Sequence, residues 1–377
     1  MEFDFSADQK QLKEQVRRFL ADRCDRHAVR AVLDGPQSHD AALWAALGEL
    51  GYLGASIPEA YGGLGAGYLE ACVIAEELGR AVAPVPWGSS IALAAECLLL
   101  AGTEAQKTAR LPGLAAGRSI ATLALAEGPG RVGPGTVATL ATRGSGGVSL
   151  SGSKAAVADG DIADFAVVAA IDAPGSAALS IYLVDLTGPG VTRTAVNTID
   201  PTRSHARIDL HDAPAEPLGE PGQGWALLDR VLDRAAVLVA FEQIGGADRA
   251  LEMARDYALE RFAFGRPIGS MQAIKHMLAD MYVSATLARS NAYYAAWALS
   301  NDTDELPQAA ATARVSATQA FQHCARNNIQ VHGGMGFTWQ FDCHLYYRRA
   351  NLLAVSLGAL SVWEDRLVQR LRAARAA

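Results

Sequence analysis

The pattern of apolar and polar positions changes twice along the chain. In the first part apolar residues recur every three or four positions, as at Leu12, Val16 and Phe19, which is the period of an amphipathic helix. The Gly-rich segment 58–66 interrupts this pattern and predicts a loop. Helices are predicted over residues 9–22, 41–50, 68–79, 90–101 and 104–110.

Between about residue 118 and residue 215 the period shortens. β-Branched or apolar runs alternate there with turns that contain Gly and Pro, a pattern typical of strands in a small sandwich or barrel. Residues 212–224 hold several Pro and Gly and are predicted to be a linker out of this region. The predicted strands are 119–125, 137–142, 148–151, 165–171, 179–185, 191–194 and 206–210.

From Trp225 onward helical periodicity returns in longer runs, near 225–259, 270–300, 304–330 and 343–374. Long, apolar-striped helices with short connections predict an antiparallel bundle. The sequence therefore predicts an α+β multidomain protein. Its expected parts are an N-terminal helical domain (1–117), a central β-barrel or sandwich (118–216) and a C-terminal four-helix bundle (217–377).

Composition and charge exclude several classes of protein. Of 377 residues 50% are hydrophobic and 19% charged, which is enough apolar material for sizeable cores. A net charge of −7 argues against nucleic acid or an anionic membrane as partner. The five Cys lack paired spacing, and Cys and His match no compact zinc pattern. No signal peptide or membrane span is recognised, so a cytoplasmic protein without a metal site is expected.

Six short motifs are distributed along the chain. They are residues 260–268 (ERFAFGRPI), 272–276 (QAIKH), 330–339 (QVHGGMGFTW), 347–350 (YRRA), 53–65 (LGASIPEAYGGLG) and 76–80 (EELGR). These motifs closely resemble those of acyl-CoA dehydrogenases, and the resemblance extends over nearly the whole chain. It implies a three-domain fold, FAD as cofactor and α,β-dehydrogenation of an acyl-CoA thioester, with electrons passing to an electron-transfer flavoprotein.

A set of residues near the two central motifs is predicted to bind FAD. The planar guanidinium of an Arg suits a pyrophosphate because it donates paired hydrogen bonds to phosphate oxygens, and clustered glycines let main chain approach a ligand. A helix-end Arg and a glycine helix cap are the plainer interpretations. By resemblance, the residues that hold FAD across a subunit interface are Arg261, Phe264, Gln272, Gln330, Gly333 and Gly334.

The resemblance is weaker in the central domain. Members of the family place a Gly- and Ser-rich loop against flavin and thioester, and here that loop reads 125–131 (LAEGPGR). A second stretch, 154–160, has Ala156 and Ala158 where the family has an aromatic and a hydroxyl side chain near the flavin ring. Side-chain donors to the flavin are therefore expected to be missing from this chain.

The catalytic base is the largest departure. The family uses a carboxylate at one of two positions, which correspond here to Leu357 and Ala235, and neither side chain can remove a proton. Glu242 lies seven residues beyond Ala235, about two helical turns along the same face, and is the remaining candidate base. The favoured alternative is a structural carboxylate that either pairs with an Arg or caps a packed interface. Asp233 is a weaker candidate.

These departures lead to three hypotheses about function. The first is an acyl-CoA dehydrogenase subunit that lacks the usual Glu and works with a sister chain in a heterotetramer, as in actinobacterial steroid side-chain degradation, or with itself in a homotetramer. The second is a non-catalytic partner that completes the cofactor site of the sister chain. The third is a flavin monooxygenase on the same fold, which also dispenses with the Glu.

Overall fold

A computed structural model describes residues 5–376 and confirms the predicted order of helices, strands and helices. The chain folds into two compact units. Unit 1 holds the described residues of Met1–Arg30, Tyr68–Ala83 and Ala236–Ala377, and unit 2 holds Ala31–Gly67 and Pro84–Ala235. The helices that precede the strands are thus shared between both units. Within the described chain no helix combines the length and the apolar character needed to cross a membrane.

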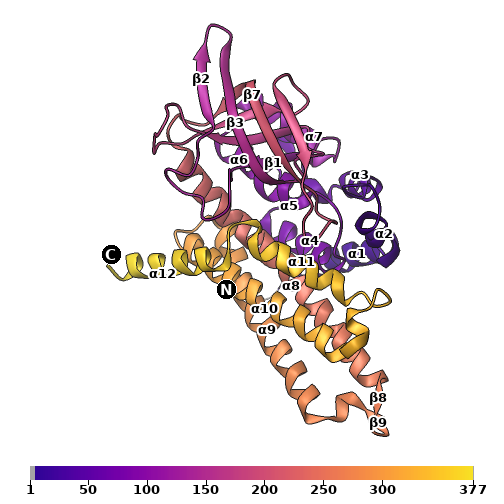
Figure 1. Ribbon diagram of the computed structural model, residues 1–377. Helices are drawn as coiled ribbons and strands as arrows, with labels where there is room; N and C mark the ends of the chain where they lie inside the picture. Colours follow the sequence, from indigo (N-terminus) through magenta and orange to yellow (C-terminus); the bar gives the residue numbers. More distant parts are fainter. Residues whose placement is uncertain (1–4, 377) are drawn as a thin grey trace. The chain divides into compact units, whose positions relative to one another are not determined.

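Unit 1 is helical and contains the predicted bundle. Ser6 and Gln9 form a capping box that starts its first helix. Figure 1 draws the two longest helices of its C-terminal part, α9 and α10, alongside each other. Its helices are α1 (Ala7–Arg23), α4 (Tyr68–Arg80), the larger part of α8 (Gly224–Glu260), α9 (Gln272–Ser300), α10 (Leu306–His332), α11 (Cys343–Ser356) and α12 (Leu360–Ala376), and α2 (Arg26–Leu33) begins in it.

Glycines allow α4 and α8 to touch backbone to backbone in unit 1. A Cβ on Gly79 of α4 would lie 1.8 Å from the carbonyl oxygen of Glu242, and one on Gly245 of α8 would lie 1.8 Å from that of Glu76. Neither partner is a flexible side chain that could move aside. The close crossing therefore depends on both glycines.

We expect Gly245→Ala to lower the free energy of unfolding by about 1–3 kcal/mol, because the extra methyl group must push two packed helices apart. Chemical denaturation followed by circular dichroism measures this change. Gly144→Ala is the control, since a Cβ at Gly144 would meet nothing within 4 Å. Equal stability of the two variants would contradict the close crossing.

The prediction of one continuous last helix over 343–374 is wrong, because the structure has two helices there, α11 and α12. Between α11 and α12 the chain turns at residues 357–359, where Gly358 adopts φ 97°. A positive φ of this kind is accessible to Gly at little cost and ends a helix. The indole N–H of Trp363 then donates to the carbonyl of Leu357 at 3.0 Å and fixes the turn.

Unit 2 is built around one seven-stranded sheet of order β1-β4-β5-β7-β3-β2, with β6 paired to β7. β1 and β4 are parallel, and the other ladders are antiparallel. A bridge between Leu140 and Ile171 brings the β2 edge back to the end of β4, so the sheet curls as in a partly open barrel. The strands are β1 (Ala121–Ala124), β2 (Leu140–Gly144), β3 (Gly147–Ala158), β4 (Phe165–Ala170), β5 (Ser180–Asp185), β6 (Val191–Ala195) and β7 (His205–Leu218).

Strand β7 is longer than the sequence predicts. The predicted linker 212–224 is wrong at its start, because β7 continues to Leu218. It pairs with β3 through Ala215 and with β5 from Glu216.

Short helices complete unit 2. The helical elements are α3 (Ala41–Glu49), η1 (Tyr52–Gly54), η2 (Glu59–Tyr61), α5 (Trp87–Ser89), the π-helical turn η3 (Ser90–Ala95), α6 (Glu96–Ala101) and α7 (Glu104–Ala115).

Candidate functional site

Arg261 and Phe264 lie where α8 ends, at one end of unit 1. The amide of Arg261 donates to the carbonyl of Tyr257 at 2.8 Å, and Ile268 donates to the carbonyl of Arg261 at 2.8 Å. Between them the hairpin of β8 (Phe262–Ala263) and β9 (Arg266–Pro267) turns at Phe264 (φ 52°) and Gly265 (φ 78°). Phe264 is 95% exposed, so its large apolar ring lies on the surface at this turn.

The glycine turn that follows α10 reaches the same end of the unit. The His332 ring stacks on that of Tyr257, with centroids 4.1 Å apart, and Tyr257 lies one helical turn before Arg261. Burial lowers the pKa of His332, so the stacked imidazole is neutral. Gly333 follows with φ 59° and ψ −138°, a conformation essentially restricted to Gly. A Cβ on Gly333 or Gly334 would meet nothing within 4 Å, so this main chain is open.

The arrangement suits a pyrophosphate. Gln272 is the exposed first residue of α9, whose N-terminus has no side-chain cap, and a helix N-terminus attracts anions through its free amides and its dipole. Gln330 is exposed in the last turn of α10. An exposed guanidinium, two carboxamides and open glycine amides at one end of a unit fit the phosphates of a dinucleotide.

Leu357, which the motif resemblance places at the first base position of the family, is apolar and 8% exposed at the end of α11. Its carbonyl is engaged by Trp363 as described above. Ala235, at the second position, is fully buried on α8, and Asp233 is 4% exposed on the same helix. The turn after α11 therefore carries no side chain at residue 357 that could accept a proton.

Glu242 is engaged in a buried ion pair. Its Oε1 lies 3.2 Å from Nη1 of Arg349 on α11, and the two side chains are 1% and 0% exposed. Arg349 also donates to the carbonyls of Val82 and Ala83 at 3.4 Å. These contacts favour the ion-pair interpretation of Glu242 over that of a free base, because its carboxylate is engaged by a buried guanidinium.

A second buried Arg holds the end of α11. Arg314 of α10 is 1% exposed, donates to Oε1 of Gln243 at 2.9 Å and to the carbonyl of Leu353. Burial lowers its pKa to about 10. Gln243 in turn donates to Thr318 at 3.1 Å. The network fixes the last turn of α11, one turn before Leu357.

In unit 2 the two stretches expected near the flavin meet each other. The amide of Ala155 donates to the carbonyl of Ala126 at 2.8 Å, and Lys154 pairs with Glu127 at 2.6 Å. Ala156 is exposed and has φ 47°, an uncommon conformation for a residue other than Gly that often marks functional sites.

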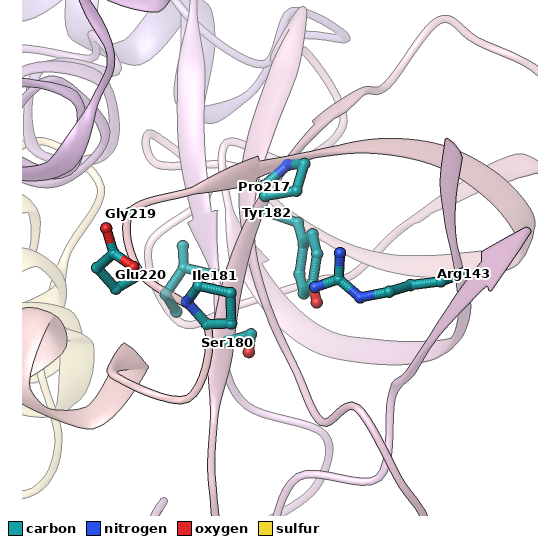
Figure 2. A pocket seen from close by; sticks show the side chains of 8 residues that line it. Arg143, Ser180, Ile181, Tyr182, Pro217, Gly219 and Glu220 are labelled. Atoms are coloured by element: carbon teal, nitrogen blue, oxygen red, sulfur yellow. The ribbon is translucent and has the colours of Figure 1, made fainter. Parts of the chain in front are cut away.

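Unit 2 also has a shallow pocket, shown in Figure 2, lined by Arg143 and Tyr182 among others. Asp172 accepts from the hydroxyls of Ser180 at 2.7 Å and Tyr182 at 2.6 Å. Burial and this carboxylate raise the pKa of Tyr182 to about 12. The pocket has a volume of about 160 Å³, including the part that is open to solvent. Pockets for small ligands usually reach about 300–1,000 Å³. It is too small for a dinucleotide.

Sequence comparisons agree with this fold and with these motifs. Residues 6–118 match the model of the acyl-CoA dehydrogenase N-terminal domain, and residues 222–371 match that of the C-terminal domain. Acyl-CoA dehydrogenase IpdE2 of Mycobacterium tuberculosis is 35% identical over 347 residues, 91% of each chain. The chain belongs to the acyl-CoA dehydrogenase family. It is accordingly an oxidoreductase of the class that acts on CH–CH groups, in a family that depends on FAD.

Solved structures of acyl-CoA dehydrogenases superimpose over almost the whole chain. A variant of the Tcur3481-Tcur3483 steroid ACAD has a TM-score of 0.88 at 31% identity and covers 98% of this chain and 99% of its own. The ChsE4-ChsE5 complex from Mycobacterium tuberculosis has a TM-score of 0.87 at 28% identity, with 99% of both chains covered. Both of these relatives are named as pairs of chains.

Sequence reasoning missed the partners of the buried charges. It expected an Arg beside Glu242 without identifying Arg349, and it gave no role to Arg314 or to the pairing of Lys154 with Glu127. For Arg314 the available signal was a lone Arg among small and apolar helical residues, which requires a partner when it is buried. The His and Cys near the glycine turn are used in packing. The His344 ring, for example, stacks on that of Trp339, with ring centroids 4.3 Å apart.

Proposed function

We propose that this acyl-CoA dehydrogenase is one subunit of a two-chain enzyme and that the sister chain, a homologous subunit, supplies the catalytic carboxylate. The observation that carries the proposal is the turn after α11, where Leu357 is buried and apolar. Removal of an α-proton needs a general base within hydrogen-bond reach. The best remaining carboxylate, Glu242, is held by Arg349.

The role of this chain is to bind FAD and to shape the site. The end of unit 1 that carries Arg261, Gln272, Gln330 and the Gly333–Gly334 turn supports pyrophosphate binding across a subunit interface, with Phe264 packing beside it. FAD held there would supply the acceptor for the hydride from the β-carbon of the thioester and the route for electrons to an electron-transfer flavoprotein. Arg261 neutralises phosphate charge, and its exposure allows it to reach a cofactor carried by a neighbouring subunit.

The proposed substrate class is a steroid-derived acyl-CoA thioester, and the proposed assembly is a heterotetramer. Support comes from the Tcur3481-Tcur3483 steroid ACAD and the ChsE4-ChsE5 complex, which align with nearly the whole chain. In this chain Ala156 is exposed on β3, which leaves room for a bulky ring system beside the loop 125–131.

Flavin stoichiometry tests the proposal. The chain is purified alone and after co-expression with a homologous acyl-CoA dehydrogenase chain from the same organism, and FAD is measured by absorbance for each mole of protein. We expect the complex to carry FAD and the isolated chain to carry little, because each site would draw groups from both chains. A flavin-saturated, homotetrameric chain that needs no partner would overturn the two-chain assembly.

We expect Arg261→Ala to reduce FAD occupancy of the complex, because it removes a charge-assisted phosphate contact worth about 1.5–3 kcal/mol. Flavin absorbance after purification and titration with free FAD measure the loss. Arg255→Ala is the control: Arg255 lies on α8, six residues before Arg261, and pairs with Asp256. Unchanged occupancy in Arg261→Ala would remove Arg261 from the cofactor site.

A further inference from the structure

One carboxylate in unit 2 closes a long glycine-rich loop. Both ends of the segment 127–139 meet at Glu127. The carboxylate accepts from the amide of Ala138 at 2.6 Å, and from the amide and hydroxyl of Thr139 at 3.0 and 2.6 Å. The residues between these ends include four glycines at which a Cβ would meet nothing within 4 Å, Gly128, Gly130, Gly133 and Gly135. The segment is a compact surface loop whose ends are tied by a single side chain.

The same carboxylate is anchored to the sheet by a buried lysine. Nζ of Lys154 lies 2.6 Å from Oε1 of Glu127, and the Lys154 side chain is fully buried. Lys154 also donates to the carbonyl of Leu125 at 3.4 Å. A buried ammonium is costly unless a partner compensates it, so the loop end and the lysine depend on each other.

The lysine stands at a bulge in β3. The pairing with β7 runs from Lys154 opposite Ile208 to Val157 opposite Ala206, which leaves one extra residue on β3. The exposed Ala156 with its positive φ is in this bulge, and the amide of Ala155 donates to Ala126 at 2.8 Å. The base of the loop and the bulge are therefore joined through two kinds of contact, one between main chains and one between side chains.

We propose that Glu127 and Lys154 are positioning residues that clasp the loop 128–138 to the bulge of β3, so that the two segments offer one fixed main-chain surface to the flavin and thioester. The contacts that form the clasp all lie within unit 2. That flavin and thioester bind beside it rests on the proposed function. In that function the clasp supplies the positioning that Ala156 and Ala158 cannot provide with side-chain donors.

The pair keeps a buried ammonium in contact with a carboxylate. Burial lowers the pKa of Lys154 to about 8, and the contacts with Glu127 act against this and raise it. Burial of the charged lysine therefore opposes folding at neutral pH, and Glu127 offsets part of that cost. Across the strand pair, β7 places the apolar Ile208 opposite Lys154.

Cleavage by trypsin measures how readily the loop 128–138 opens. Arg131 is exposed within it, and Arg143, exposed in β2, provides an internal reference in the same unit. In the full chain, Glu127→Gln and Lys154→Met should raise cleavage after Arg131, relative to cleavage after Arg143, about tenfold or more. Asp209→Asn, which removes the exposed pair with Arg207, should leave the ratio unchanged.

Circular dichroism identifies variants that fold, and the double variant Glu127→Gln/Lys154→Met is included because it leaves no charge buried alone. If every folded variant cleaves like the unchanged chain, the clasp is wrong. Flavin binding to the complex is then compared in the folded variants. Faster cleavage with weaker flavin binding supports the whole proposal. Faster cleavage with unchanged flavin binding shows that the clasp holds the loop but contradicts its role in positioning flavin. Absence of flavin from the unchanged complex would instead refute the proposed function.

Discussion

The purified chain alone is expected to oxidise acyl-CoA thioesters at least about a hundredfold more slowly than its complex with the sister chain, because general-base catalysis typically contributes about 10²–10⁴-fold. The prediction follows from the proposal that Leu357 and Ala235, both apolar and buried, occupy the two base positions of the family. Reduction of an artificial electron acceptor, measured with a steroid-derived acyl-CoA and matched amounts of enzyme, gives the ratio. The assay is run with FAD in excess so that the flavin content of the isolated chain does not limit it.

The chain that supplies the base can be identified within the complex. Replacing the catalytic Glu of the sister chain by Gln should remove activity by the same factor of about 10²–10⁴ while FAD stays bound. The volume-conserving change Leu357→Met in this chain should leave activity nearly unchanged. Rapid turnover by the isolated chain would contradict the two-chain mechanism, and Glu242 would then be the first residue to test.

The order of elements could be predicted from the sequence because it depends on local periodicity. The long apolar stripes after Trp225 have the period of a helix, and the short runs between about 118 and 215 do not. The break at Gly358 was missed because a single Gly is compatible with a helical pattern, and only the three-dimensional structure shows its φ of 97°. The continuation of β7 was missed because Pro214 and Pro217 suggest a linker, although each lies in a ladder.

The candidate site could be predicted only in part, for a different physical reason. Arg261, Gln272 and the Gly333–Gly334 turn belong to contiguous motifs, and their exposure at one end of unit 1 follows from helix ends. The ion pairs join residues far apart in the sequence, such as Glu242 with Arg349 and Glu127 with Lys154. Such pairing is decided by tertiary packing, which leaves no periodic signal in the sequence.

The pair of Glu242 with Arg349 is expected to contribute to stability, and Glu242→Gln tests this. Both side chains are almost completely buried. Replacement by Gln removes the negative charge and leaves the Arg349 guanidinium uncompensated in the core of unit 1. Breaking a buried pair on one side typically costs about 3–5 kcal/mol. We expect a loss of this size in the free energy of unfolding, measured as a lower denaturant midpoint at unchanged slope.

Two further variants separate the pair from other effects of substitution. The double change Glu242→Leu/Arg349→Met replaces both charges by apolar groups and should recover much of the lost stability, because neither charge is then buried alone. Asp256→Asn breaks the exposed pair with Arg255, and it should cost about 1 kcal/mol or less. A double variant no more stable than Glu242→Gln would mean that packing, rather than charge, accounts for the loss.

The same substitution distinguishes the two roles considered for Glu242. A structural partner of Arg349 should yield an unstable protein whose remaining folded fraction, mixed with the sister chain, keeps its turnover per bound flavin. A catalytic base should yield the reverse: stability close to that of the unchanged chain, FAD retained, and turnover lowered by about 10²–10⁴-fold. The Glu242–Arg349 distance of 3.2 Å and the almost complete burial of both side chains lead us to expect the first result, because the carboxylate is engaged with the guanidinium inside the core of unit 1.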